Sequence, residues 1–374
     1  MVELTKSGVF IRDDKELGAR VFSPFTGLFF NVPEQDVPKV KAWLNRSSDD
    51  VDIYYKTTIG LEWDINFQDA YTLTPSDAFD IMPDRVIRLP MVINWILTGQ
   101  CTHKCSYCYA ADMRNTPSTL ISKEAVDIII ERILSYEPIA VVLSGGEPLL
   151  CKFLDYIIEQ LYDKVGLILD TNGHLLNEER LHFLNKYNVV IRISVDSLIS
   201  KNEKKFRTFG SSKLDKEELN ITIEALNLCL RNEAKVIVHT VVTTANVNDL
   251  LSMGEKLYSL GVKVWKLMEL ACFDKKRLLP FHIEHEKFRK VFLSRLHMRE
   301  RSQWNQRMRI IYQRNKPNIP NSTILVNPKG EFVFQSIENG KIPIDNENPF
   351  QPTLDKIYTC IDLWEHQRRY FGEV

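Results

Sequence analysis

The sequence predicts an α/β protein: a partial (β/α)6 barrel with a small α+β region before it and a second α+β region after it. Two observations predict this class. Short β-branched runs alternate with longer amphipathic stretches between residues 90 and 270, and neither flank shows that alternation. Strands separated by helices of this length form a parallel sheet through right-handed crossovers. Six repeats suit an open or partial barrel better than a closed eight-fold one.

The barrel elements follow from hydrophobic periodicity. Strands are predicted at residues 91–97, 139–144, 165–170, 189–196, 235–243 and 263–268. Helices are predicted at residues 122–136, 153–163, 177–187, 215–231 and 248–261, because their apolar residues recur at spacings of three and four. Several of these helices open with Ser, Asp or Asn, which are good N-caps. In such sheets, function gathers at the loops that follow the carboxyl ends of the strands.

The two flanks predict hairpins and single helices. At the N-terminal side, residues 19–32 predict a hairpin turning at 24–27, followed by a helix over 33–46. At the C-terminal side, residues 323–335 predict a hairpin and residues 354–371 a final helix. The basic run 301–316 is interpreted as the solvated face of a helix. The chain of 374 residues is therefore divided into regions 1–85, 86–300 and 301–374.

Charge and composition exclude several classes of protein. The chain has 48 Lys and Arg against 49 Asp and Glu, a net charge of −1, so it lacks the basic excess of a nucleic-acid-binding protein. No stretch approaches the roughly 20 apolar residues of a membrane span, and the first residues do not form a secretory signal. Seven cysteines without such a signal argue against a disulfide framework, so a cytoplasmic protein with available thiolates is expected.

Three cysteines stand directly after the first predicted barrel strand. Cys101, Cys105 and Cys108 are spaced by four and three residues in a polar loop, which lets three thiolates converge on one small metal centre. Soft thiolates select zinc or iron–sulfur clusters. Three protein ligands would leave one iron of a cluster open to an outside molecule. The alternative is a zinc knuckle completed by His103 or a distant ligand, in a zinc-stabilised interaction protein without enzymatic activity.

This loop resembles that of the radical S-adenosylmethionine (SAM) superfamily, whose pattern is CxxxCx(aromatic)C, with Tyr107 as the aromatic residue. A second motif, Gly145-Gly146-Glu147 at the end of the second strand, resembles the family's GGE motif. Glycines let a backbone approach a ligand closely. The resemblance implies that the Glu147 carboxylate holds the amino group of SAM.

The resemblance also implies SAM contacts after the later strands. The residues at those positions are Thr171 and Asn172 after the third strand, Ser194 and Asp196 at the fourth, and Arg207 further on. In relatives an arginine pairs with the SAM carboxylate, a task that suits a guanidinium because it donates two hydrogen bonds. Turn and loop roles remain the alternatives for these five residues.

The chemistry implied by the resemblance needs one [4Fe-4S] cluster and SAM. The reduced cluster, supplied by a donor such as flavodoxin or ferredoxin, cleaves SAM to a 5′-deoxyadenosyl radical that takes hydrogen from a substrate. The cofactor performs the difficult step and the barrel positions it. The protein is therefore expected to be a radical SAM enzyme.

The flanks favour a peptide or protein side chain as the substrate. Residues 19–45 are similar to the start of peptide-binding domains of peptide maturases, which take a leader peptide as an added strand. Residues 324–364 resemble a SPASM or twitch module, but Gln335 stands where a cluster cysteine is expected, so that module is predicted without auxiliary clusters. The other cysteines are predicted to be buried apolar residues: Cys151, Cys229, Cys272 and Cys360. The alternative substrate is a small metabolite or nucleotide.

Overall fold

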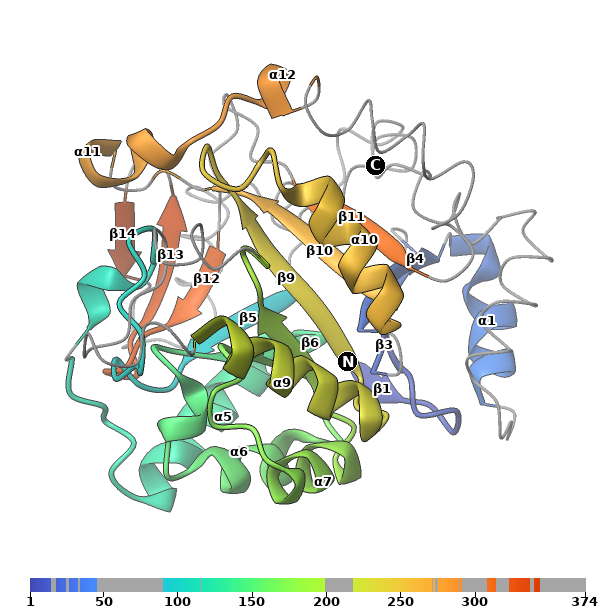
Figure 1. The fold of residues 1–374 in the computed structure, drawn as a ribbon. Coiled ribbons are helices and arrows are strands. Elements are labelled where there is room, and N and C mark those ends of the chain that lie inside the picture. Colours follow the sequence, from blue (N-terminus) through green and yellow to red (C-terminus); the bar gives the residue numbers. More distant parts are fainter. Residues whose placement is uncertain are drawn as a thin grey trace.

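The computed structural model gives the arrangement of most of the chain (Figure 1). The residues described are 1–14, 18–24, 27–32, 34–45, 90–114, 116–198, 218–270, 272, 275–288, 290, 308–313, 323–336 and 340–343. Arg207, Cys360 and the helix predicted over 354–371 lie outside these residues. No helix in the described ranges is long and apolar enough to cross a membrane.

A parallel sheet forms the centre of the protein, as the alternation of the sequence predicts. Its six central strands, in chain order, are β5 (Val92–Ile96), β6 (Ala140–Ser144), β7 (Gly166–Thr171), β8 (Val190–Ser194), β9 (Val236–Val242) and β10 (Val264–Glu269). Each strand pairs in parallel with the next one in the chain. The loops that follow these strands therefore meet at one edge of the sheet.

Helices cover the outer face of this sheet (Figure 1). They are α5 (Lys123–Ser135), α6 (Leu154–Leu161), α7 (Glu178–Lys186), α9 (Glu218–Arg231) and α10 (Leu250–Leu260). Side chains cap two of them: Ser122 Oγ accepts a hydrogen bond from the N–H of Ala125, and Asn177 Oδ1 accepts one from the N–H of Arg180. Gly261, at φ +86°, ends α10 in the left-handed conformation that favours glycine.

Short helical turns occupy the connections. They are η2 (Glu34–Asp36), η4 (Ala111–Met113), η5 (Pro148–Leu150), α11 (Lys275–Leu278), η6 (Leu279–Phe281) and α12 (His285–Phe288). Of these, η4 lies in the segment after the three cysteines, η5 directly follows Glu147, and α11 lies a few residues beyond β10.

The C-terminal region extends the barrel sheet on both edges. Strand β11 (Arg309–Gln313) pairs in parallel with β10, and β12 (Thr323–Val326) pairs in parallel with β5. Strands β13 (Phe332–Ser336) and β14 (Gly340–Pro343) continue from β12 in antiparallel order, which completes a 10-stranded sheet. The helix expected within 301–316 is therefore wrong for residues 309–313. These residues form a strand because Ile311 joins an apolar core that the barrel sheet supplies.

The N-terminal region is a four-stranded antiparallel sheet with one helix. Its elements are β1 (Val2–Leu4), β2 (Phe10–Asp13), β3 (Ala19–Ser23), β4 (Leu28–Val32) and α1 (Val37–Leu44). The hairpin predicted over 19–32 is β3 and β4, whereas the hairpin of β1 and β2 was not predicted. All five residues of β3 are buried.

This N-terminal sheet packs against the base of the barrel. One apolar cluster joins residues of β2, β3 and α1 to the first inward-facing residues of the barrel strands, among them Val190, Ile237 and Val264. The contact is close, because a Cβ added to Gly166 of β7 would lie 2.0 Å from the Phe22 ring. The two regions therefore share one core.

Buried arginines reinforce that contact. Arg12, which is 0% exposed, donates hydrogen bonds of 2.6 Å to the carbonyl of Pro90 and 2.8 Å to that of Glu137. Its Nε also donates to the Asp14 carboxylate at 2.7 Å. Arg20 lies beside the same carboxylate, and burial lowers the pKa of Arg20 to about 10.

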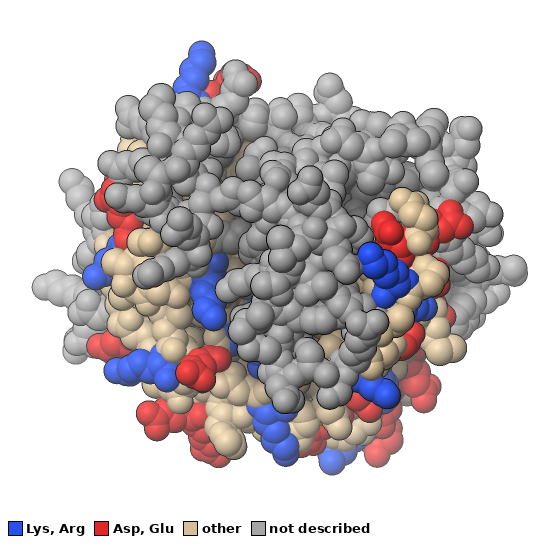
Figure 2. Space-filling view, turned by 90° about the vertical axis from the view of Figure 1, so that its right-hand side faces the viewer, with Lys and Arg blue, Asp and Glu red and all other residues tan. Residues whose placement is uncertain are grey.

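The described surface mixes both signs of charge. On the face shown in Figure 2, blue and red side chains lie side by side along the lower rim and the right-hand side. No extended basic area appears among the described residues of that face, in keeping with the balanced composition.

Candidate active site

The three-cysteine loop leaves the carboxyl end of β5. None of the three cysteines forms a disulfide, and each is partly exposed. The Sγ atom of Cys101 accepts a hydrogen bond from the N–H of His103 at 3.4 Å. Burial raises the pKa of the Cys101 thiol, the bond from His103 lowers it, and the charges of Glu147 and Cys108 raise it further. The pKa of Cys101 therefore depends on the charges of two other predicted site residues, Glu147 and Cys108.

Two arginines hold the carbonyl groups of this loop. Arg114 Nη2 donates to the carbonyl oxygen of Cys105 at 3.0 Å. Arg277 of α11 donates from Nη1 to Ser106 at 2.8 Å and from Nη2 to Cys108 at 3.0 Å. Sequence reasoning missed both arginines, because neither lies in a recognisable motif and Arg277 follows Cys108 by 169 positions.

The two glycines bring the end of β6 against the start of the cysteine loop. The N–H of Gly146 donates to the carbonyl of Thr98, and the N–H of Glu147 donates to that of Gln100, both at 2.7 Å. A Cβ on Gly146 would lie 2.1 Å from the Gln100 oxygen, and one on Gly145 would lie 2.8 Å from the Thr98 oxygen. The close approach that requires glycine here is therefore made to the protein's own loop.

The Glu147 carboxylate is fully buried and lies against the end of β7. Its Oε1 accepts hydrogen bonds from Thr171 Oγ1 at 2.7 Å and from the N–H of Leu149 at 3.2 Å, and its Oε2 accepts one from the N–H of Asn172 at 2.9 Å. Because a buried carboxylate needs such donors, Thr171 and Asn172 act as supports of Glu147.

Asn172 also contacts the cysteine loop. Its Nδ2 donates to Thr102 Oγ1 at 3.0 Å and lies 2.9 Å from His103 Nδ1. The His103 ring packs edge-on against that of His174, with centroids 4.3 Å apart. His103 is thus buried between the loop and the segment after β7.

Tyr107 and Asp196 form a second pair across the site. The Tyr107 hydroxyl donates to Asp196 Oδ2, and both residues are buried. Asp196 Oδ1 accepts the N–H of Val241 at 2.8 Å, and Asn246 Nδ2 donates to the Asp196 carbonyl at 2.9 Å. Asp196 therefore connects the aromatic residue of the cysteine loop to β9. Ser194 is the last residue of β8 and is partly exposed.

Most predicted site residues therefore lie at one edge of the sheet. The hydrogen bonds described above join these residues to one another: Thr171 to Glu147, Asn172 to the cysteine loop, and Tyr107 of that loop to Asp196. Arg207 alone lies outside the described residues.

The donor set fits an iron–sulfur cluster by its chemistry. Three free thiols on one short loop are the soft ligands that such clusters take, and they release protons on binding metal. Within the described ranges, no group of three or more His, Cys, Asp or Glu is already arranged to hold a single metal ion.

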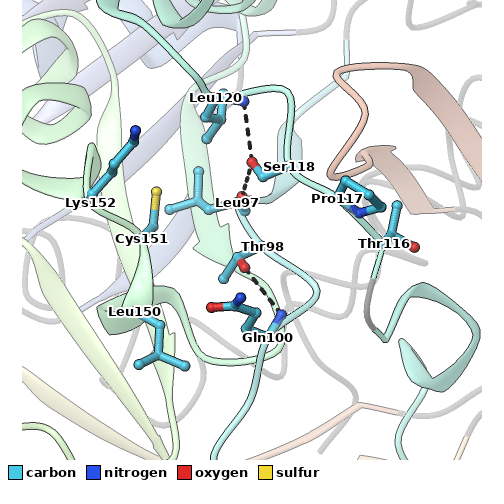
Figure 3. A pocket seen from close by; sticks show the side chains of 10 residues that line it. All are labelled: Leu97, Thr98, Gln100, Thr116, Pro117, Ser118, Leu120, Leu150, Cys151 and Lys152. Carbon is cyan, nitrogen blue, oxygen red and sulfur yellow. Dashed lines mark hydrogen bonds between the residues drawn. The ribbon is translucent and has the colours of Figure 1, made fainter.

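A pocket of about 330 Å³ lies beside the cysteine loop, between the end of β5 and the segment before α5 (Figure 3). Gln100 and Thr98 line one side, joined by a hydrogen bond of 3.1 Å from the Gln100 N–H to Thr98 Oγ1. Ser118 fixes another side, because its Oγ donates to the Leu97 carbonyl and accepts from the Leu120 N–H.

The remaining cysteines were predicted to be buried, and this holds for only some of them. Cys229 is buried, and burial raises its pKa to about 12. Cys151 lines the pocket and Cys272 follows β10, and both are only partly buried. Burial still raises the pKa of Cys151, so its thiol is not activated.

Comparison with known proteins identifies the barrel. Residues 95–257 match the family described as the Radical SAM superfamily. In sequence the chain is 23% identical over 248 residues to an S-adenosylmethionine-dependent nucleotide dehydratase of Flammeovirga pacifica, covering 64% of this chain and 81% of that one. It is 33% identical over 171 residues to a GTP 3′,8-cyclase of Helicobacter pylori, covering 42% of this chain and 49% of that one.

The fold is similar to solved structures over 76% to 98% of the chain. SuiB of Streptococcus suis bound to precursor peptide SuiA aligns with a TM-score of 0.62 at 10% identity, covering 98% of this chain and 90% of that one. Native anSMEcpe with bound AdoMet and Kp18Cys peptide aligns with a TM-score of 0.57 at 15% identity, covering 76% of this chain and 84% of that one. At these identities the likeness establishes the fold alone.

Proposed function

Because the chain is a radical SAM enzyme, we propose that it modifies a peptide or protein side chain. The observation that supports this substrate class most is the extent of the likeness to SuiB, a protein crystallised with its precursor peptide. That likeness covers 98% of this chain, so it includes the N-terminal sheet as well as the barrel.

The cofactors of this family are a [4Fe-4S] cluster and SAM, and when bound they supply abstraction of a hydrogen atom from the substrate. Cys101, Cys105 and Cys108 would hold the cluster. Gly145, Gly146 and Glu147 would lie along SAM, with Glu147 facing its amino group. Arg207 would pair with its carboxylate.

The chain's own residues would set the orientation of these groups. Thr171 and the Asn172 N–H hold the Glu147 carboxylate in one orientation through bonds of 2.7 Å and 2.9 Å, so it need not reorganise when an ammonium group arrives. Asp196 is held by Tyr107 and by the Val241 N–H, which fixes the orientation of its carboxylate. These residues would bind and orient SAM, and the burial of Glu147 keeps water from its carboxylate.

The N-terminal sheet supports a peptide as the substrate. Its outer strands β1 and β4 each pair on one side only within the part of the chain that the structure describes. Glu3 and Leu4 of β1 are exposed. An open strand edge offers unpaired N–H and C=O groups to an incoming extended peptide.

The test uses the full chain, because the N-terminal sheet shares its core with the barrel and would lose that core in isolation. The reconstituted enzyme is incubated with SAM, dithionite and each short peptide encoded beside its gene. A mass change in one peptide, absent with a Cys101→Ala/Cys105→Ala/Cys108→Ala variant, is the expected result. An unchanged mass of every peptide, together with turnover of a nucleotide, would refute the proposal.

A nucleotide substrate is the second candidate. It is favoured by sequence rather than by fold, because the relatives above are named as a nucleotide dehydratase and a GTP cyclase. The matching assay replaces the peptide with CTP, GTP or UTP and measures 5′-deoxyadenosine. Formation that depends on one nucleotide, and not on any peptide, selects this candidate.

A further inference from the structure

A row of polar side chains lies on the inner face of the barrel sheet, directly above its apolar base. The base on strands β6, β7 and β8 belongs to the core shared with the N-terminal sheet and is formed by Val142, Ile168 and Val190. Side chains two residues apart on a strand point to the same face, so the next inward residue of each strand is polar. These three residues form the polar row: Ser144, Asp170 and Arg192.

Strand register sets the polar row level across the three strands. Asp170 is paired with Arg192, and the pairing of Leu143 with Leu169 puts Ser144 beside Asp170. The side chains of Asp170 and Arg192 also form an ion pair, in which Arg192 Nη2 donates to Asp170 Oδ2 at 2.6 Å. Because the two formal charges offset each other, the polar row has no net charge.

A tyrosine of the cysteine loop reaches this row. Tyr109 directly follows Cys108, and its hydroxyl forms a hydrogen bond of 3.2 Å with Ser144 Oγ in which either group can donate. Burial raises the pKa of the Tyr109 phenol, the bond to Ser144 lowers it, and the charge of Asp170 raises it further. Tyr109 therefore connects the third cysteine of the loop to the polar row.

The Tyr109 side chain is nevertheless accessible. The residue is 38% exposed, although its phenol is surrounded closely enough for burial to raise the pKa. A side chain that is both accessible and surrounded by protein lines a recess rather than a convex surface. Partial exposure of inward residues on the neighbouring strands marks the same recess: Asn94, Asp170, Ser194, His239, Val241 and Met268.

We propose that Tyr109 is a substrate-contact residue, whose ring packs against the substrate and whose hydroxyl, paired with Ser144, hydrogen-bonds a neutral polar group of it. The inference rests on the proposed function, because it takes a peptide as the substrate and a backbone amide as that neutral group. A hydroxyl donates and accepts, and so does an amide, so the two groups match without any charge. The absence of net charge in the polar row suits an amide better than a phosphate.

The place of Tyr109 in the chain gives this contact its importance. A substrate held by Tyr109 lies beside Cys108, and therefore beside the loop that would hold the cluster. Reacting groups must be held within about 3–3.5 Å, and a misplacement of about 1 Å costs roughly a hundredfold in rate. The Tyr109 ring has few torsions to freeze and is already tied to Ser144, so it orients a substrate at a low cost in entropy.

The experiment uses the reconstituted holoenzyme with SAM and dithionite. The probes are the short peptides encoded beside the gene and, in separate reactions, CTP, GTP and UTP. The variants are Tyr109→Phe, which removes only the hydroxyl, Tyr109→Leu, which removes the ring, and Tyr162→Phe as a matched control at the exposed end of α6. The measured quantities are the KM of the probe, the 5′-deoxyadenosine formed per modified product, and the Kd of SAM.

We expect the two Tyr109 variants to differ in what they lose. Tyr109→Phe should raise the KM of the modified peptide by about threefold to tenfold, because one hydrogen bond is lost. Tyr109→Leu should also raise the 5′-deoxyadenosine formed per product by about tenfold or more, because the substrate is no longer aligned. The Kd of SAM and all properties of Tyr162→Phe should stay near wild type.

The outcomes separate this inference from the proposed function. These effects with a peptide support both, whereas the same effects with a nucleotide support the contact at Tyr109 and refute the peptide. A peptide modified equally well by wild type and Tyr109→Leu overturns the contact and leaves the peptide substrate standing. A parallel loss of SAM affinity also overturns the contact, because Tyr109 would then bind SAM.

Cross-linking decides where Tyr109→Leu fails to fold or no probe is turned over. The variants Tyr109→p-benzoylphenylalanine and, as the control, Tyr162→p-benzoylphenylalanine are irradiated with each peptide and each nucleotide, and adducts are located by mass spectrometry. An adduct at position 109 that is absent at position 162 supports the contact. No adduct at position 109 with any of these probes overturns it.

Discussion

Arg277 Nη2 donates a hydrogen bond of 3.0 Å to the carbonyl oxygen of Cys108, although the two residues lie 169 positions apart. The other terminal nitrogen of Arg277 donates to the Ser106 carbonyl at 2.8 Å. The guanidinium thus ties the segment after the last barrel strand to the loop after the first one. The position of the three cysteines depends on this contact as well as on the loop's own sequence.

Removing this contact should loosen the cysteine loop. Arg277→Ala eliminates two charge-assisted hydrogen bonds, so we expect the free energy of unfolding to fall by about 2 kcal/mol. We also expect the cluster to lose iron to a chelator several-fold faster and its electron paramagnetic resonance spectrum to broaden. Lys276→Ala, on the exposed neighbour, is the control. Identical iron release from Arg277→Ala and wild type would show that the loop does not need the contact.

The iron content should report one cluster per chain. After anaerobic reconstitution we expect about four irons and four sulfides, because three thiolates and SAM suffice for one [4Fe-4S] cluster. The Cys101→Ala/Cys105→Ala/Cys108→Ala variant should retain none. About eight irons, with half surviving in the variant, would instead assign an auxiliary cluster to the C-terminal region. Zinc in place of iron would contradict the cluster itself.

Glu147→Gln should weaken both the fold and SAM binding. An amide keeps the shape of the carboxylate, but its NH2 group would face the Thr171 hydroxyl or the Asn172 N–H, which are donors. We expect a loss of about 1–3 kcal/mol in the free energy of unfolding and a rise of at least tenfold in the Kd for SAM. Calorimetry and thermal melting measure the two effects. The control is Glu159→Gln, an exposed carboxylate that accepts from the Tyr187 hydroxyl at 3.2 Å.

Arg12→Met should separate the N-terminal sheet from the barrel. The change leaves the Asp14 carboxylate without the Nε donor at 2.7 Å and leaves the Pro90 carbonyl without its 2.6 Å partner. Breaking such a buried ion pair costs about 3–5 kcal/mol. Lys41→Met removes the partially exposed ammonium near Asp13 at 3.5 Å and should cost less than about 1 kcal/mol. Chemical denaturation of both variants tests the difference, and equal losses would refute the role of Arg12.

Local sequence was sufficient for the barrel strands. The predicted runs 139–144 and 165–170 agree with β6 and β7 to within one residue, because short apolar runs rich in Val, Ile and Leu favour buried strands of a parallel sheet. The hairpins formed by β3–β4 and by β12–β13 were predicted from the sequences of their turns. The hairpin of β1 and β2 was missed, since charges interrupt its apolar residues and Phe10 and Ile11 are buried only by a core assembled from distant parts of the chain.

The sequence by itself determined the cysteine loop, the glycines and Glu147, since each is a short motif whose spacing carries its chemistry. Only the tertiary structure decided which distant groups support them: Arg277 on the loop, Thr98 and Gln100 against the glycines, and Thr171 on Glu147. It also decided that residues 309–313 form a strand beside β10. The physical reason is the same in each case: hydrogen bonds and strand register join residues that are far apart in the chain, and no local pattern records such a partner.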